Sequence, residues 1–341
     1  MSVMDAFEIT RAMIDIDSVN PNETEIGQWM ADYLRPFAEQ YGGRLEVVEV
    51  EPGRNNVWAY WGEPDVVLST HMDTVPPHIP SREDDEFIWG RGACDTHGIC
   101  AAMIKATEAL LAEGVRDFGI LLVVGEEVDG LGARFANQNP PTSIRYLING
   151  EPTSNLLGLG SKGTVRLDLS ATGKAAHSAY PELGDSAINK LLDNLQALRA
   201  VEWPVHPVLG PSTLNIGVID GGEASNIIAD RASAQVVIRV VADVEETKKL
   251  AYDALDDRVE VKLVTETPAV LLEAMEGFET CVVKYTTDIP KLTDWGKPLL
   301  LGPGTIHVAH TLEEHIAKKE IVEAIDLYQR LIKKLKTTTK N

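Results

Sequence analysis

Short, uninterrupted runs of apolar residues constrain the fold of this chain more than any other feature. Such runs occur at Val66–Leu68, Ile120–Val124 and Tyr146–Ile148. A strand that is covered on one face alternates apolar and polar side chains, whereas a strand covered on both faces is apolar throughout. The runs therefore predict an α/β fold, in which helices flank both faces of a mostly parallel sheet.

Amphipathic spacing predicts the helices that would cover this sheet. Residues 5–17 and 24–40 repeat apolar side chains at helical spacing, and Asn22 is the expected N-cap of the second helix. The alanine-rich segment Ile99–Leu111 predicts a buried helix. Further strands and a docking C-terminal helix are expected at Leu45–Val50, Asn56–Trp61, Pro298–Leu301 and Ile321–Leu335. The polar tail, residues 333–341, is expected to fray.

The pattern changes between residues 163 and 272, where strands and helices are expected in the order β-α-β-β-α-β. The predicted segments are Val165–Ser170, Ser186–Leu198, Leu214–Ile219, Ala234–Val241, Val244–Leu255 and Val259–Val264. This order is typical of a ferredoxin-like domain. We therefore expect a larger domain made of residues 1–162 and 273–341, interrupted by a ferredoxin-like domain over residues 163–272.

The charge balance argues against two classes of partner. The 341 residues include 52 Asp and Glu but only 31 Lys and Arg, so the formal net charge is −21. A field of that sign repels phosphate backbones and anionic lipid headgroups, so we expect neither nucleic acid nor a membrane as a partner. No apolar run approaches the ~20 residues of a membrane span.

Cysteine usage and the N-terminal segment indicate the compartment. The three cysteines, Cys94, Cys100 and Cys281, have no C-x-x-C spacing, which argues against a disulfide framework and a Cys-based zinc finger. The first residues, MSVMDAFEIT, contain neither the basic nor the apolar part of a secretion signal. We therefore expect a cytoplasmic protein.

Five short segments concentrate His, Asp and Glu side chains. They are residues 69–77, 90–98, 123–130, 148–154 and 302–310. Each follows a predicted strand or stands at a strand-to-helix junction. Because ligands of open α/β sheets bind beyond the carboxyl ends of the strands, we expect these loops to converge on one crevice.

The residue types in these loops favour a metal site over simpler roles. Asp73 could orient the His71 ring, although a solvated loop would give the same H-x-D pattern. Glu126 and Glu127 end a buried strand, where adjacent carboxylates repel unless a cation compensates them; one exposed and one N-capping Glu is the alternative. Asp95 could equally be a helix N-cap.

Two more candidates are ambiguous when each is taken alone. Glu151 precedes a proline, and His310 precedes a Thr-Leu-Glu-Glu sequence that predicts the start of a helix. The joint occurrence of so many ligand-type side chains at strand ends is what favours a shared metal site.

A set of strings spanning residues 69–314 resembles one known family. The strings are STHMDTVP, GRGACDTHG, GEEVDG, GEPT, GKAAHSA, GGEASNIIA and GPGTIHVAHTLEE. In this order they look like the signatures of the dinuclear zinc hydrolases that include acetylornithine deacetylase, succinyl-diaminopimelate desuccinylase, aminoacylase and glutamate carboxypeptidase. The family's architecture is a zinc-binding α/β domain with an inserted ferredoxin-like dimerisation or lid domain, in agreement with the predicted pattern.

The resemblance implies a set of metal ligands at matching positions. His71 and Glu151 would bind one zinc, Glu127 and His310 the other, and Asp95 would bridge both. Two zinc ions, with cobalt as a possible replacement, are the implied cofactors. Three carboxylates against two divalent cations leave a formal charge of +1, which favours a hydroxide and an anionic substrate group.

The resemblance also implies the residues that act on the substrate. Glu126 matches the general acid/base, and Asp73 matches the residue that supports the first histidine ligand. His177 matches a histidine that reaches the neighbouring site from a partner subunit and stabilises the tetrahedral oxyanion. This match implies a homodimer.

Three further positions match substrate-binding residues, and one departs from the family. Asn226 and Arg239 would hold the substrate's α-carboxylate, and Gly304 lies in a turn that would let substrate approach the backbone. His97 stands where many family members have a lysine, so it is either a neutral group behind the ligands or a surface replacement.

Together these observations predict a metal-dependent amidohydrolase of a small N-acyl-amino acid, closest to acetylornithine or acetylcitrulline deacetylase. The alternative is a dipeptidase or carboxypeptidase of the same family. A metal-binding scaffold dimer without activity is a third interpretation. The presence of Glu126 argues against it, because a structural site needs no base beside its ligands.

Overall fold

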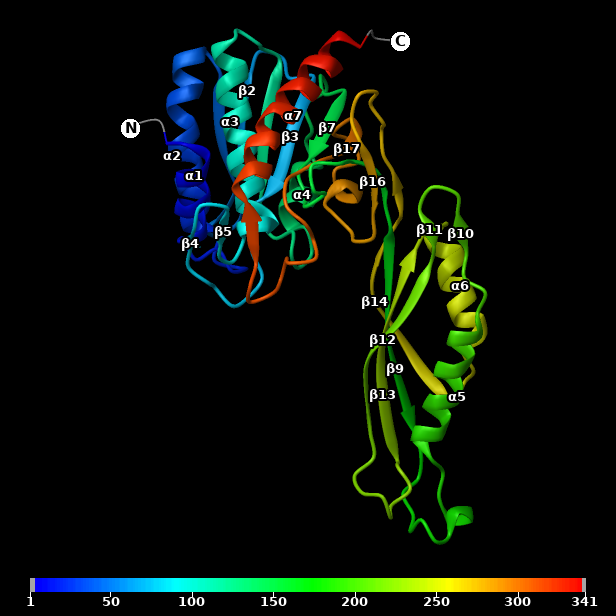
Figure 1. Cartoon of the computed structure of the whole chain (residues 1–341). Helices are drawn as coiled ribbons and strands as arrows, with labels where there is room; N and C mark the ends of the chain where they lie inside the picture. Colours follow the sequence, from blue (N-terminus) through cyan, green and yellow to red (C-terminus); the bar gives the residue numbers. More distant parts are fainter. Residues whose placement is uncertain (1–3, 339–341) are drawn as a thin grey trace. The chain divides into compact units, whose positions relative to one another are not determined.

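The computed structural model describes residues 4–338 and divides the chain into two compact units (Figure 1). The larger unit consists of Met1–Leu159, Leu272–Cys281 and Thr287–Asn341. The smaller unit consists of Gly160–Leu271 and Val282–Thr286. None of the helices within residues 4–338 is both long and apolar enough to cross a membrane.

A six-stranded sheet organises the larger unit. Its strands run in the order β1 (Arg44–Glu51), β2 (Arg54–Trp61), β6 (Phe118–Val123), β3 (Val66–His71), β7 (Tyr146–Asn149) and β17 (Lys297–Leu300). The four strands from β6 to β17 are parallel, whereas β1 and β2 form an antiparallel edge. All residues of β3 and β6 are buried, so the prediction from their apolar runs is confirmed.

Helices cover both faces of this sheet, which explains why its central strands carry apolar side chains on both sides. One face packs against α1 (Ala6–Ile14), α2 (Thr24–Tyr41), α3 (Gly98–Ala112) and α7 (Lys318–Thr337), and Figure 1 shows α3 and α7 side by side. The other face packs against α4 (Leu131–Ala136) and Trp295. The predicted α/β fold class is therefore confirmed.

Three local expectations are wrong. The N-cap of α2 is Glu23 and not Asn22, and it makes no side-chain capping hydrogen bond. The Thr-Leu-Glu-Glu sequence after His310 begins no helix, because β18 (His315–Ala317) intervenes before α7. Part of the polar tail is helical rather than frayed, since α7 extends to Thr337, and residues 339–341 lie outside the described residues.

Short strands complete the larger unit around the sheet. A three-stranded sheet has the order β18, β5 (Phe87–Trp89) and β4 (Arg82–Glu83). In this sheet His315 pairs with Trp89, so the segment that follows His310 lies beside the segment that precedes Asp95. A helical turn at Ala93–His97 then leads directly into α3.

The smaller unit has the predicted β-α-β-β-α-β order. Its main elements are β9 (Gly163–Thr172), α5 (Ala187–Ala200), β12 (Thr213–Gly221), β13 (Arg231–Val240), α6 (Val244–Ala254) and β14 (Val259–Thr267). A short hairpin of β10 (Val205–His206) and β11 (Gly210–Pro211) lies between α5 and β12 in the sequence. The strands form an antiparallel sheet in the order β12-β13-β9-β14. Residues of β13 alternate between buried and more exposed, and the buried ones share a core with α5 and α6.

The chain enters and leaves the smaller unit through paired strands. Strand β8 (Leu157–Ser161) lies between β15 (Val270–Leu271) and β16 (Thr280–Val283). Gly160, where the smaller unit begins, is the direct antiparallel partner of Leu271, after which the chain returns to the larger unit.

Candidate active site

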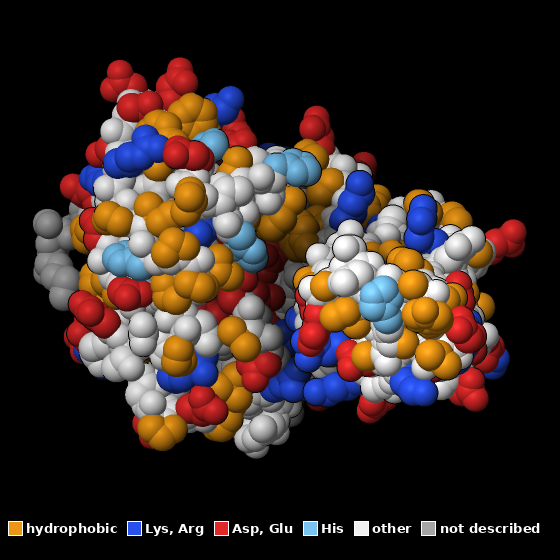
Figure 2. Space-filling view, turned by 90° about the horizontal axis from the view of Figure 1, so that it is seen from below, with side chains coloured by type: hydrophobic (Ala, Val, Ile, Leu, Met, Phe, Trp, Pro, Cys, Tyr) orange, Lys and Arg blue, Asp and Glu red, His pale blue; other side chains and the backbone are white. Residues whose placement is uncertain are grey.

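The candidate site begins where three parallel strands of the larger unit end together. His71 at the end of β3 pairs with Val123 at the end of β6, and Ser69 pairs with Asn149 at the end of β7. The loops that follow these strands therefore leave the sheet from one edge. Histidine side chains and a group of acidic side chains are visible on a face of this unit (Figure 2).

Two histidines and two carboxylates meet at this edge. The Nε2 atom of His71 lies 3.1 Å from Asp95 Oδ1, and the Nε2 atom of His310 lies 3.5 Å from Asp95 Oδ2 and 2.9 Å from Glu127 Oε1. One ligand-type atom from each of His71, Asp95 and Glu127 lies within 4.8 Å of the others. The two oxygens of Asp95 thus face two different imidazoles, which is the arrangement that a bridging carboxylate needs.

Asp73 connects the first histidine to the pair of glutamates. The Nδ1 atom of His71 lies 3.0 Å from the backbone oxygen of Asp73 and 3.6 Å from its Oδ1. The backbone N–H groups of Glu126 and Glu127 donate to Oδ1 and Oδ2 of Asp73 at 3.0 and 3.1 Å. Asp73 therefore orients the imidazole mainly through its backbone, while its carboxylate shapes the turn that carries both glutamates.

Two more carboxylates at this edge of the sheet have raised pKa values. Glu151 is 4% exposed, and its Oε1 atom has no hydrogen-bond partner among the described residues. Burial raises the pKa of Glu151 well above its usual value, and the charges of Glu126 and Asp95 raise it further. Burial also raises the pKa of Glu126, with an added contribution from Asp288. Such carboxylates are costly to bury unless a cation or a proton neutralises them.

The neighbouring carboxylates also raise the pKa values of both histidines. Burial lowers the pKa of His71, but hydrogen bonds with Asp73 and Asp95 outweigh this effect and hold it well above its usual value. Interactions with Asp95 and Glu127 raise the pKa of His310 to about 10. A metal ion would take the place of these protons, because metal binding requires neutral imidazoles. The donor set and the orphaned Glu151 oxygen therefore fit divalent cations.

Sequence reasoning missed a buried ion pair that holds Asp95 in place. Arg91 Nη1 donates to Glu314 Oε2 at 2.5 Å, and both side chains are 1% exposed. The other oxygen of Glu314 accepts the backbone N–H groups of Cys94 and Asp95 at 3.2 and 3.1 Å. The neighbouring Glu313 has the same side chain but is exposed at the surface. The two glutamates differ only in their tertiary contacts, so no signal in the sequence indicates that Glu314 is the one that binds the Cys94–Asp95 backbone.

His97 is buried behind the ligands, so the expectation of a surface replacement is wrong. Its Nε2 atom lies 3.3 Å from the backbone oxygen of Met72 and 3.4 Å from Ser18 Oγ. Burial lowers the pKa of His97 to about 4, so the ring is neutral near pH 7. Gly92 leaves room for it: at a φ of +85°, an added Cβ would lie 2.6 Å from His97 Nδ1.

Three of the predicted residues lie in the smaller unit. His177 and Asn226 are neighbours, since the N–H of Ser178 donates to the backbone oxygen of Asn226 at 3.0 Å, and both residues are exposed. Arg239 lies at the other end of β13, where its Nη1 donates to Thr164 Oγ1 at 2.8 Å.

The register of the sheet separates these candidates within one chain. Arg231 begins β13 five residues after Asn226 and is eight residues from Arg239 along the strand, which at ~3.3 Å per residue corresponds to about 26 Å. One α-carboxylate therefore cannot contact both Asn226 and Arg239 of the same chain. If both residues bind the same α-carboxylate, Asn226 and Arg239 would have to come from two different chains.

Gly304 has a structural explanation of its own. It is buried with a φ of +81°, and an added Cβ would lie 2.7 Å from Cys94 Sγ. Its N–H donates to Glu320 Oε2 at 3.1 Å. These contacts explain the glycine without a substrate, and its predicted role in substrate binding stays a prediction.

Comparison with known proteins finds relatives that carry peptidase names. A protein of Schizosaccharomyces pombe described as containing a peptidase M20 domain is 39% identical over 334 residues, which cover 94% of this chain and 82% of that protein. A probable carboxypeptidase of Aspergillus clavatus is 36% identical over 365 residues, covering 95% and 87% of the two chains. The crystal structure of a tripeptidase from Staphylococcus aureus shares the fold, with a TM-score of 0.79, 22% identity and coverage of 96% and 97%.

These proteins carry peptidase names, so the closer resemblance to acetylornithine deacetylase stays a prediction. The family model described as peptidase family M20/M25/M40 matches residues 67–334, which include every histidine and carboxylate of the candidate site. The ligand cluster at the edge of the sheet and this match lead to one conclusion: the chain belongs to the M20 family of metallopeptidases.

Proposed function

We propose that this chain is a two-metal exopeptidase that removes the C-terminal residue of a small peptide. The observation that carries the proposal is the cluster of His71, Asp95, Glu127 and His310, with the part-buried carboxylate of Glu126 and the buried carboxylate of Glu151 nearby. Zinc suits this mixture of imidazole and carboxylate ligands. We assign His71 and Glu151 to one ion, Glu127 and His310 to the other, and Asp95 to both.

Glu126 is the proposed proton carrier of the reaction. When bound, the metals lower the pKa of a water molecule and polarise the scissile carbonyl. Glu126 takes the proton of the attacking water and passes it to the leaving amine. His97 and Asp73 hold the His71 loop from behind, so the imidazole keeps its orientation during turnover.

The substrate class rests on the similarity to a probable carboxypeptidase over nearly the whole chain. Arg239 is suited to grip a free α-carboxylate, because a guanidinium binds carboxylates in a two-pronged geometry. A second candidate is deacetylation of an N-acetyl-amino acid such as acetylornithine. It is favoured by the GPGTIHVAH string and the preceding Thr287-Asp288 pair, which resemble the deacetylase branch.

Metal analysis and a substrate panel test this proposal together. The purified protein should bind two zinc or cobalt ions per chain, and their removal by a chelator should abolish hydrolysis until metal is restored. Fewer than one equivalent of metal with full activity would overturn the two-metal assignment.

The panel should contain dipeptides, tripeptides, their C-terminal amides, acetylornithine and acetylcitrulline. We expect cleavage to require a free C-terminal carboxylate. If an acetyl-amino acid exceeds every peptide tenfold in kcat/KM, which equals about 1.4 kcal/mol of transition-state preference, the deacetylase candidate replaces the exopeptidase.

A further inference from the structure

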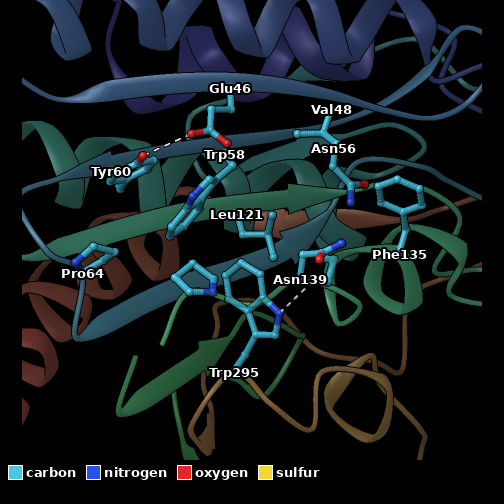
Figure 3. A pocket seen from close by; sticks show the side chains of 12 residues that line it. Glu46, Val48, Asn56, Trp58, Tyr60, Pro64, Leu121, Phe135, Asn139 and Trp295 are labelled. Carbon is cyan, nitrogen blue, oxygen red and sulfur yellow. Dashed lines mark hydrogen bonds between the residues drawn. The ribbon is translucent and has the colours of Figure 1, made fainter. Parts of the chain in front are cut away.

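A separate cavity of about 330 Å³ opens on the larger unit, on the sheet face that packs against α4 (Figure 3). Glu46 of β1, Trp58 and Tyr60 of β2, Phe135 of α4 and Trp295 line it. None of the residues that line this cavity belongs to the metal-ligand cluster. The cavity is therefore a different site from the candidate active site.

Aromatic rings in fixed positions form the wall of this cavity. The ring of Trp58 stacks on Tyr60 with 5.2 Å between centroids and meets Trp295 edge-on at 5.4 Å. Trp58 is 7% exposed and Trp295 only 3% exposed. The indole N–H of Trp295 donates to the backbone oxygen of Ala136 at 3.3 Å. A ligand would meet rings that are already held in place by packing, so little side-chain entropy would be lost.

Glu46 is the charged side chain that lines the cavity, and Arg44, the cross-strand partner of Tyr60, lies two residues before Glu46 on β1. Glu46 is exposed at the cavity and accepts a hydrogen bond from the Tyr60 hydroxyl at 3.1 Å, as Figure 3 shows. The lining contains no Lys or Arg. Within residues 4–338, the cation–π contacts of the protein involve other rings: Trp89, Tyr41, Tyr146, Phe7 and Phe278.

We propose that this cavity binds a small organic cation, an ammonium group that carries apolar carbons. Aromatic rings attract a cation, and Trp58, Tyr60 and Trp295 line the cavity together with the Glu46 carboxylate, which adds a charge of the complementary sign. An anion would be repelled by Glu46. A neutral apolar ligand would use the rings but gain nothing from the carboxylate.

Calorimetric titration with choline tests the proposal, with 3,3-dimethylbutan-1-ol as the neutral molecule of the same shape. Both titrations use the full chain with zinc present, so that the acidic metal site is already occupied. We expect choline to bind at least tenfold more tightly than the alcohol. Equal binding of the two would overturn the claim of cation recognition, and so would the absence of choline binding.

Variants locate the binding site. Glu46→Gln should weaken choline at least fivefold, and Phe135→Ala should weaken both probes. Glu49→Gln is the matched control, since Glu49 lies on the same strand outside the cavity and accepts from the Gly53 N–H at 3.1 Å. Choline affinity should also be unchanged in Glu126→Gln. If Glu126→Gln or Glu49→Gln weakens choline as much as Glu46→Gln, the aromatic cavity is not its site.

Discussion

The candidate residues of the two units differ in how completely their surroundings fix them. In the larger unit, His71 is 1% exposed and Asp73 fully buried, and backbone groups hold both. In the smaller unit, His177 and Asn226 are exposed and held chiefly by local backbone contacts. His71 and Asp73 are preorganised within one chain, whereas the side chain of His310 in the same unit is 49% exposed. The side chains of the second group, His177 and Asn226, are open to solvent.

The end of the smaller unit that carries His177 has features of a contact surface. Strand β12 is an edge of its sheet, and edge strands offer unpaired backbone groups to a partner. Large apolar side chains are exposed there, namely Tyr180, Leu183, Val218, Ile219 and Ile227. A second copy of the chain is the partner we expect, because the resemblance of His177 implies action across a dimer.

The largest expected effect tests the preorganised group. Glu126→Gln should lower kcat by about 10²- to 10⁴-fold while both metals stay bound, because the proton carrier is lost and no ligand is removed. Glu127→Gln is the matched comparison and should instead release one metal. Turnover and bound metal are measured on the same samples. Normal turnover of Glu126→Gln would contradict its assignment as the base.

The next prediction tests the exposed group. His177→Ala and Glu126→Gln should each be inactive alone, but mixing them under subunit exchange should restore part of the activity. A mixed dimer would contain one site with Glu126 from one chain and His177 from the other. Exchange is verified with two differently tagged chains. If exchange occurs and no activity returns, the site is completed within one chain and the contrast between the two units disappears.

A smaller effect is expected from the ion pair that anchors Asp95. Glu314→Gln should weaken zinc binding by about 10- to 100-fold, because residues behind the ligands tune affinity to this extent. Competition with a chromophoric chelator measures the affinity. The control is Glu313→Gln, whose side chain is 79% exposed and should leave affinity unchanged. Equal effects of the two variants would remove the anchoring role.

The smallest effect concerns His97 and pH. Its folded-state pKa of about 4 lies below the ordinary value near 6.5, so between these values the unfolded chain binds a proton that the folded chain does not. The contribution of the neutral His97 ring to the free energy of unfolding therefore falls as the pH decreases from 6.5 to 4, by up to about 3 kcal/mol.

Urea unfolding of the metal-free protein measures this contribution as the difference between wild type and His97→Gln at several pH values. Wild type should lose stability relative to the variant as the pH falls. The exposed His177→Gln serves as the control and should follow wild type. A constant difference between wild type and His97→Gln would contradict the buried, neutral histidine.

Sequence reasoning succeeded where a local pattern determines the outcome. Apolar runs predicted the strands because burial on both faces favours apolar side chains, as at Val66–Leu68 of β3 and throughout β6. The loops of His71, Glu126 and Glu151 could be grouped because parallel strands end at one edge. The ferredoxin-like order followed from helix and strand periods alone.

What could not be predicted depends on contacts distant in sequence. Glu314 and Glu313 are adjacent and identical, yet only Glu314 reaches Arg91, 223 residues away. Asp288 raises the pKa of Glu126 from a different loop, and no local signal indicates that proximity. The separation of Asn226 from Arg239 follows from strand register, which is set by pairing and not by either residue.

The pairing of Gly160 with Leu271 has a consequence for how the chain folds. The parts of the larger unit before and after the insertion can meet only if the intervening segment is closed into a loop. Loop closure costs entropy that grows with the logarithm of loop length. Folding of the smaller unit joins its own two ends at this residue pair, so the remaining chain behaves as if the insertion were a tight turn. Prior folding of the smaller unit therefore lowers the loop-closure entropy that the larger unit must overcome to complete its sheet, compared with an insertion that is still unfolded.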